Sequence, residues 1–169
     1  MPHIDFNDLP EHSRIWVFPS SRTLSEHETQ SLLAEVDAFL AGWAAHGHAL
    51  RSGRLFVEGS FLLVGVDEDA EAPSGCSIDA LVNRLEALGS ALGVHLVDHA
   101  PVWFRDGSAV RMLGRSEFRR LAQDGAVTPD TRVFDTSLTQ MRVLRQEGLE
   151  RAARDSWHGR AFFRESPAS

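Results

Sequence analysis

The feature that most constrains this chain is an amphipathic helix that begins at Ser25. Ser25 followed three positions later by Glu28 has the form of a capping box, in which each side chain bonds the backbone N–H of the other residue. Apolar residues then recur at helical spacing: Leu32, Leu33, Val36, Phe39, Leu40 and Trp43. Gly47 is the expected stop. A helix with one apolar face must bury that face, so the neighbouring segments have to supply another layer.

Those neighbours alternate between strand and helix patterns. In chain order the sequence predicts a strand at 14–18, the helix from Ser25, strands at 50–57 and 61–66, a second helix capped by Ser77 and stopped at Gly93, and a strand at 94–97. This β-α-β-β-α-β order is the ferredoxin-like split pattern. We therefore expect an α+β ferredoxin-like domain over residues 14–100, preceded by a flexible arm at 1–13.

Residues 101–160 are expected to form a second, smaller α+β unit. The sequence predicts a hairpin over 102–113, a short helix capped by Ser116, a strand at 132–134 and a last helix beginning near Asp135. Residues 161–169 form the tail. Trp157, Phe162 and Phe163 are hard to leave in water, so part of this C-terminal region should dock back onto the unit.

The second unit resembles a bacterial GYF-like module. The resemblance lies in Trp103-Phe104-Arg105-Asp106-Gly107, in Ser116-Glu117-Phe118 and in Thr128-Pro129-Asp130-Thr131. In eukaryotic members of that family an aromatic patch binds proline-rich peptides. The resemblance implies a GYF-like fold and, at most, a peptide-binding role.

The first half resembles small uncharacterised bacterial proteins, some of them described as transporter ATPases. The resemblance lies in Trp43-Ala44-Ala45-His46-Gly47, Val66-Asp67-Glu68 and Gly75-Cys76-Ser77-Ile78-Asp79. All 17 basic residues are arginine. A phosphate-binding loop of the G-x-x-x-x-G-K type therefore cannot be built, and the sequence does not support the ATPase description.

Composition narrows the classes of function. The net charge of −7 argues against a broad nucleic-acid footprint. No apolar run reaches the length of a membrane span, and the single cysteine forms no intrachain disulfide. We expect a cytoplasmic protein with no cofactor and no metal.

One end of the predicted first domain gathers polar groups. Its topology places His46 and His48 on the rim where the acidic loop after residue 66 leads to Cys76 at a helix start. A helix N-terminus favours a thiolate, and a nearby imidazole would complete a Cys–His pair. The same groups can ligate zinc. Against this, a lone cysteine is commonly a small buried hydrophobe, and the run from Asp67 to Asp69 is more often a solvated turn than a cation site.

A second candidate surface combines aromatic and arginine side chains: Trp103, Phe104, Arg105 and Trp157. Such a surface suits a protein or peptide partner, although the strand can equally pack its rings into the unit's own core. Arg22, just before the first helix, marks a place for an anion or simply a solvated side chain. The sequence favours a non-enzymatic peptide-binding adaptor. The alternative is a small enzyme or redox protein that uses Cys76 with His46 or His48.

Overall fold

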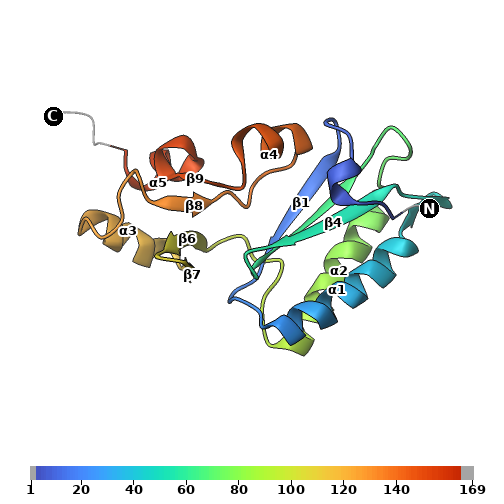
Figure 1. Cartoon of the computed structure of the whole chain (residues 1–169), viewed down its shortest axis with the longest axis horizontal. Helices are drawn as coiled ribbons and strands as arrows, with labels where there is room; N and C mark the ends of the chain where they lie inside the picture. The colour runs from blue at the N-terminus through green and yellow to red at the C-terminus, as the bar shows by residue number, and fades with distance from the viewer. Residues whose placement is uncertain (1–2, 165–169) are drawn as a thin grey trace. The chain divides into compact units, whose positions relative to one another are not determined.

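The computed structural model describes residues 3–164 and is a mixed α+β structure with antiparallel sheets (Figure 1). The chain divides into two compact units, the first running to Asp98 and including Ser137–Gln146, the second containing His99–Thr136 and the chain from Glu147. The sequence predicted continuous ranges of 14–100 and 101–160, so it did not predict that the chain goes back to the first unit. The segment 137–146 belongs to the first unit although it follows most of the second in the chain.

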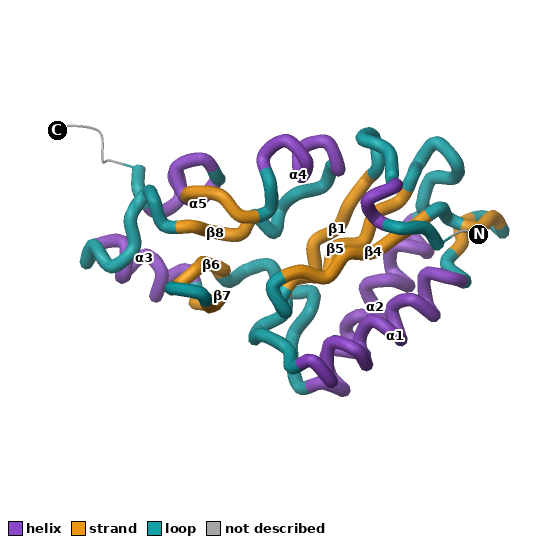
Figure 2. The backbone as a smooth tube through the Cα atoms, viewed as in Figure 1, coloured by secondary structure: helices purple, strands orange, loops and turns teal. Residues whose placement is uncertain are grey.

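The first unit is built on a three-stranded sheet in the order β1-β5-β4 (Figure 2). Its strands are β1 (Arg14–Pro19), β5 (Phe61–Val66) and β4 (Ser52–Val57), and both pairings are antiparallel. The central strand β5 is buried along its whole length, as expected for a strand with neighbours on both edges. All three strands lie where the sequence predicted them, within two residues.

Helices α1 (Glu26–Ala41) and α2 (Gly75–Leu92) cover one face of this sheet (Figures 1 and 2). The capping box of Ser25 and Glu28 is confirmed, with both reciprocal hydrogen bonds present. The expected cap of α2 was wrong by one turn. Ser74 is its N-cap and Ser77 is the third helical residue, because these two serines form a capping box of their own. The apolar faces of α1 and α2 pack with Val64, Val66 and Phe18 in one core.

Helix α1 also ends earlier than expected. It stops at Ala41, and Gly42 is the C-cap. The chain then forms a short hairpin of two antiparallel strands, β2 (Ala44–Ala45) and β3 (His48–Ala49). His46 and Gly47 make its turn with φ of 53° and 78°, the left-handed pair that such tight turns require. Gly47 therefore serves the hairpin turn and not the helix end.

The opposite face of the sheet is covered by η1 (Phe6–Asp8) and by the start of α4 (Met141–Glu147). Side chains alternate across a strand, so Gly65 faces away from the helices that contact Val64 and Val66. A Cβ atom on Gly65 would lie 2.7 Å from Leu9 Cδ1 and 3.5 Å from Met141 Cε. Phe6 and Leu9 are 3% and 2% exposed. Residues 3–13 are thus packed against the sheet, in contrast to the flexible arm expected from the sequence.

Residues 94–97 do not form the predicted strand and pair with neither edge of the sheet. Val94 and Leu96 are nevertheless buried in the core with α1 and α2. The free edge of β1 receives short contacts instead. Thr139 O accepts from Ile15 N (2.9 Å), and His95 O accepts from Ser21 N (3.0 Å) just beyond the strand.

The second unit contains a four-stranded antiparallel sheet in the order β7-β6-β8-β9. Its strands are β6 (Val102–Asp106), β7 (Ala109–Leu113), β8 (Arg132–Phe134) and β9 (Glu150–Ala152). Its helices are α3 (Arg115–Gln123), η2 (Ala153–Asp155) and α5 (Trp157–Phe162). The predicted hairpin and strand 132–134 are confirmed. Gly114, not Ser116, is the N-cap of α3, and the last predicted helix begins at Met141.

The core of the second unit is centred on Phe118. Its ring meets those of Phe104, Phe162 and Phe163 edge-on, with centroid distances of 5.2, 4.9 and 6.3 Å. Edge-to-face contacts at these separations are favourable for aromatic pairs. The predicted docking of the C-terminal region onto this unit is therefore confirmed for its phenylalanines.

Candidate functional site

The side chains of one histidine and two aspartates lie close together in the first unit. His12 Nε2 lies 3.0 Å from Asp67 Oδ1 and 3.0 Å from Asp69 Oδ2. One ligand atom from each of the three residues lies within 4.8 Å of the others. Over residues 3–164, this is the one such cluster of three histidine, cysteine or acidic side chains. The arrangement is suited to holding a cation.

The backbone around His12 is fixed from several sides. Ser13 N donates to Pro10 O, while Met141 N and Arg142 N donate to the carbonyls of Ser13 and Glu11. Arg145 strengthens this attachment. Its guanidinium donates to Glu11 Oε1 (2.6 Å) and to Leu9 O (2.7 Å). The start of α4 thereby holds the segment that carries His12 at a defined position.

Asp67 is presented at the end of the central strand. It follows β5 directly, and its backbone N–H donates to Arg51 O (2.9 Å). Its side chain is largely buried, and Oδ1 also accepts from the backbone N–H of Asp69 (3.1 Å). This local turn orients the second carboxylate toward the same imidazole. Two of the three groups are therefore held by the main chain before any ligand binds.

A cavity of about 690 Å³ adjoins the cluster. It is lined by Glu11, His12, Ser13, Arg14, Glu68, Thr139, Gln140 and Arg142. Ser13 is 1% exposed, and its hydroxyl has no hydrogen-bond partner among the described residues. A buried hydroxyl without a partner costs free energy. The cavity is large enough for a small polar ligand beside the cluster.

Cys76, His46 and His48 of the predicted rim are not part of this cluster. Cys76 is exposed in the first turn of α2, and His46 and His48 are exposed on the β2–β3 hairpin. The hairpin does approach α2, because Trp43 Nε1 donates to Ser77 O (2.8 Å). Within the described part of the chain, however, no hydrogen bond joins Cys76 to either imidazole. The Cys–His pair stays a prediction.

The aromatic residues predicted to bind a peptide are placed differently from one another. Trp103 and Phe104 are each 2% exposed, so neither offers the surface expected from the sequence. Phe104 packs against Phe118 in the core of the unit. Trp157 is half-buried, and the guanidinium of Arg115 lies 5.0 Å from its ring. Of the three predicted aromatic residues, only Trp157 is accessible.

Arg105 is engaged within its own unit. It donates from Nε and Nη2 to the two carboxylate oxygens of Glu150, at 2.6 and 2.9 Å. This bidentate pair, together with the charge of Arg132, holds the pKa of Glu150 below its usual value. The predicted binding role of Arg105 is thus in competition with an internal ion pair.

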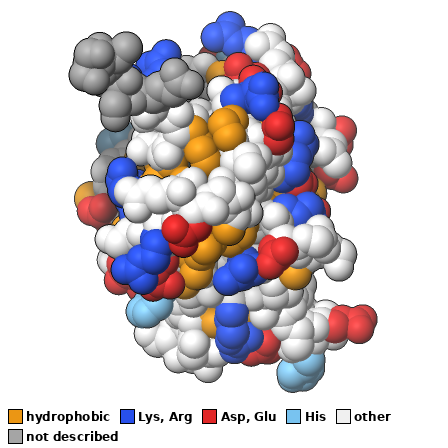
Figure 3. All heavy atoms as spheres, turned by 90° about the vertical axis from the view of Figure 1, so that its left-hand side faces the viewer, with side chains coloured by type: hydrophobic (Ala, Val, Ile, Leu, Met, Phe, Trp, Pro, Cys, Tyr) orange, Lys and Arg blue, Asp and Glu red, His pale blue; other side chains and the backbone are white. Residues whose placement is uncertain are grey.

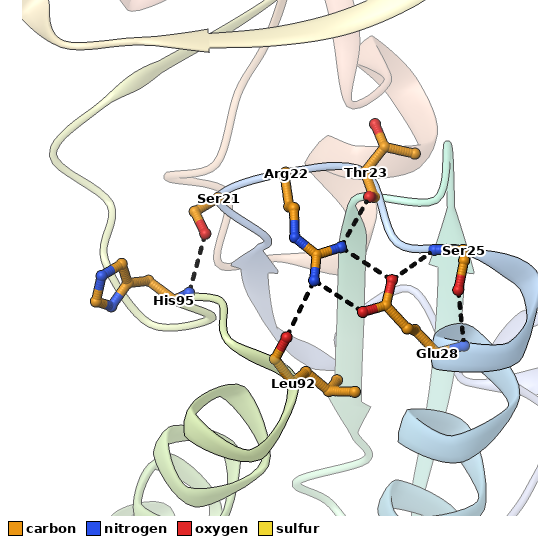
Figure 4. Close-up of polar contacts among 7 residues, drawn as sticks. All are labelled: Ser21, Arg22, Thr23, Ser25, Glu28, Leu92 and His95. Carbon is orange, nitrogen blue, oxygen red and sulfur yellow. Dashed lines mark hydrogen bonds and ion pairs between the residues drawn. The ribbon is translucent and has the colours of Figure 1, made fainter.

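Arg22, which the sequence suggested as a place for an anion, is paired with the carboxylate of Glu28 (Figure 4). Its guanidinium donates to both carboxylate oxygens of Glu28 (2.9 and 2.8 Å) and to Leu92 O (3.0 Å). The side chain therefore links the start of α1 to the end of α2. Arg22 therefore stabilises the fold of the first unit and does not offer a free anion site.

Sequence reasoning missed His12 and Arg142, because residues 1–13 were taken for an arm and α4 for part of the second unit. The spacing of Phe6 and Leu9 is the one signal in the sequence that residues 1–13 pack against the domain.

No described helix is both long and apolar enough to cross a membrane. No protein-family model, curated protein or solved structure matches the chain, so function is inferred from the geometry alone.

Proposed function

We propose that the first unit binds a divalent transition-metal ion through His12, Asp67 and Asp69. The observation that carries this proposal is the position of His12 Nε2, 3.0 Å from an oxygen of each aspartate. Ligand atoms at right angles on metal bonds of about 2.1 Å are about 3.0 Å apart. The spacing therefore suits neighbouring ligands of one ion.

The chemical types of the three ligands narrow the choice of metal ion. An imidazole favours zinc, iron or other late transition metals, while carboxylates suit manganese and magnesium. One imidazole with two carboxylates is a mixed set, which suits Mn²⁺ or Zn²⁺ better than Ca²⁺. Three protein ligands also leave coordination positions for water or another molecule. The adjoining cavity provides room for it.

Titration with Mn²⁺, followed by electron paramagnetic resonance of the free ion, tests this proposal directly. We expect one ion bound per chain, and at least a tenfold loss of affinity in Asp67→Asn and His12→Gln. The matched controls are Asp79→Asn and His27→Gln, which alter exposed residues of the same types. A wild-type chain that binds neither Mn²⁺ nor Zn²⁺ would show that the three side chains form only an ion pair. Equal affinity in all four variants would place any bound ion elsewhere.

A second candidate is the binding of an acidic peptide by the second unit. A hollow of about 530 Å³ is lined by Pro129, Arg154, Gly159, Arg160, Phe163 and Arg164. Hydrophobic side chains are exposed between arginine and acidic side chains on the face shown in Figure 3. Arg160 and Arg164 are exposed and have no ion-pair partner among the described residues. Unpaired guanidinium groups beside an aromatic ring favour a carboxylate-bearing partner.

This second candidate keeps the adaptor role inferred from the sequence, without Trp103 and Phe104. A fluorescein-labelled peptide of alternating glutamate and proline is a suitable probe, read by anisotropy. We expect saturable binding that weakens with salt and is lost in Arg160→Gln/Arg164→Gln. Arg84→Gln, in the first unit, is the control and should bind as the wild type does. A peptide that binds the double variant equally well would overturn the proposal.

We also propose a ferredoxin-like fold for the first unit and a GYF-like fold for the second. The order β1-β5-β4 with α1 and α2 on one face supports a ferredoxin-like arrangement without its fourth strand. The hairpin, short helix and strand at 132–134 support a GYF-like second unit.

A further inference from the structure

We infer that the cavity beside His12 takes a small phosphorylated ligand, which binds together with the metal ion. This inference rests on the proposed metal site, and it adds the class of ligand. It is carried by two arginines that line the cavity, Arg14 and Arg142. Neither has an ion-pair partner among the described residues.

The two guanidinium groups are available for different reasons. Arg14 is half-buried, and its guanidinium lies over the ring of Trp16, 4.7 Å from the centroid. Stacking on a ring orients the guanidinium and leaves its N–H groups free to donate. Arg142 is exposed on the first turn of α4. The neighbouring acid Glu11 is already bound by Arg145 (2.6 Å), so it does not neutralise Arg142.

Charge makes the binding of the anion depend on the metal. Without an ion, the carboxylates of Asp67, Asp69 and Glu68 oppose the entry of an anion, which only the two arginines attract. A divalent ion cancels the charge of the two aspartates, which leaves two positive groups against Glu68. The ligand and the ion should therefore strengthen each other's binding by the same factor, as linkage requires.

Phosphate fits this arrangement better than a carboxylate does. A phosphate group has three oxygens, so one can fill an open position on the ion while the others accept from guanidinium N–H groups. Arginine forks recognise phosphate through two parallel hydrogen bonds. Metal ions with few protein ligands commonly share substrate phosphates.

The test uses inorganic phosphate and Mn²⁺ with the full chain. Broadening of the ³¹P resonance reports phosphate close to bound Mn²⁺, and paramagnetic resonance reports Mn²⁺ binding separately. The Asp67→Asn chain gives the background from Mn²⁺–phosphate complexes in solution. We expect the wild type to broaden phosphate well beyond this background. We also expect phosphate to raise the affinity for Mn²⁺.

Arg142→Gln and Arg14→Gln should weaken phosphate binding at least about tenfold while the affinity for Mn²⁺ alone stays within about twofold. Arg120→Gln, at an exposed arginine of the second unit that belongs to no proposed site, is the matched control. Unchanged phosphate binding in both cavity variants would overturn the inference, as would equal binding of acetate and phosphate by the wild type. Absence of Mn²⁺ binding would instead remove the proposed metal site itself, so the two failures are distinguishable.

Discussion

Glu28 accepts hydrogen bonds from Arg22 through both of its carboxylate oxygens while it completes the capping box of α1 (Figure 4). One carboxylate thus serves the helix start and the connection to Leu92 O at the end of α2. The hydrogen bond from Arg22, followed by that from Ser25 N, lowers the pKa of Glu28 to about 2. Glu28 is therefore held in its ionised form by the folded chain.

Acid should release this arrangement. Because the pKa of Glu28 is lower in the folded state, the unfolded chain takes up the proton first. Its stabilising effect is present above about pH 4.5 and is lost as the pH falls toward 2. Glu28→Gln should reduce the loss of stability between these values, as measured by urea unfolding at pH 5 and pH 3. Glu26→Gln, an exposed acid in the same turn, is the control, and identical behaviour of the two variants would contradict the prediction.

His158 should set a second pH dependence, in a different window. Its side chain is buried, and its Nδ1 lies 2.8 Å from Ser156 Oγ. Burial is the main cause that lowers its pKa to about 4, with Arg115 and Arg151 adding to the effect and Asp135 opposing it. The folded chain therefore holds a neutral imidazole.

Since the unfolded chain binds a proton below about pH 6.5, folding should weaken from pH 6.5 down to 4. The loss is expected to reach about 3 kcal/mol. His158→Gln should lower stability at pH 7 and flatten this part of the profile. His27→Gln, at an exposed site, should keep the wild-type slope. A wild-type profile as flat as that of His158→Gln would show that the imidazole is not held neutral.

Local patterns predicted most elements of the first unit, because they depend on residues close in sequence. The capping box at Ser25 and the apolar stripe of α1 are examples. The prediction of a strand at 94–97 was wrong, because a buried loop and a buried strand show the same apolar pattern in the sequence. Val94 and Leu96 are buried under helices without joining the sheet. Apolar character alone does not distinguish these two outcomes.

The sequence drew attention to Asp67 and Asp69, but it could not supply His12, because the tertiary fold brings this residue to them. His12 lies 55 positions from Asp67 and is held by the segment around Arg142 and Arg145. No spacing rule connects these positions. The aromatic surface failed for a related reason. The ring of Phe104 is buried by contact with Phe118 of α3, which the local pattern around residue 104 does not reveal.

Gly53→Ala should detach the N-terminal segment from the sheet. A Cβ atom at Gly53 would lie 2.5 Å from Ile4 O and 3.0 Å from Phe6 N, both of them backbone atoms that cannot rotate away. We expect a loss of about 1–3 kcal/mol, typical of overpacking, and faster proteolysis between residues 3 and 13. Gly42→Ala is the matched control, because its Cβ would meet nothing within 4 Å. Equal stability of the two variants would show that η1 does not pack as described.

Cys76 should be accessible and structurally neutral. It is exposed in the first turn of α2, whose capping box is made by Ser74 and Ser77. We expect complete reaction with a thiol-specific disulfide reagent in the native state, and a change of less than about 0.5 kcal/mol in Cys76→Ser. The measurements are the absorbance of the released thiolate and urea unfolding. Labelling that requires denaturant would contradict the exposed position.

Phe104 should behave as a core residue and not as part of a binding surface. Its ring packs edge-on against Phe118 at 5.2 Å, and only 2% of the residue is exposed. Phe104→Ala removes a fully buried ring and should cost about 3–5 kcal/mol. Phe163→Ala removes the same side chain from a half-buried position 6.3 Å from Phe118, so its cost should be clearly smaller. Urea unfolding measures both, and equal costs would mean that Phe104 is not the better buried of the two.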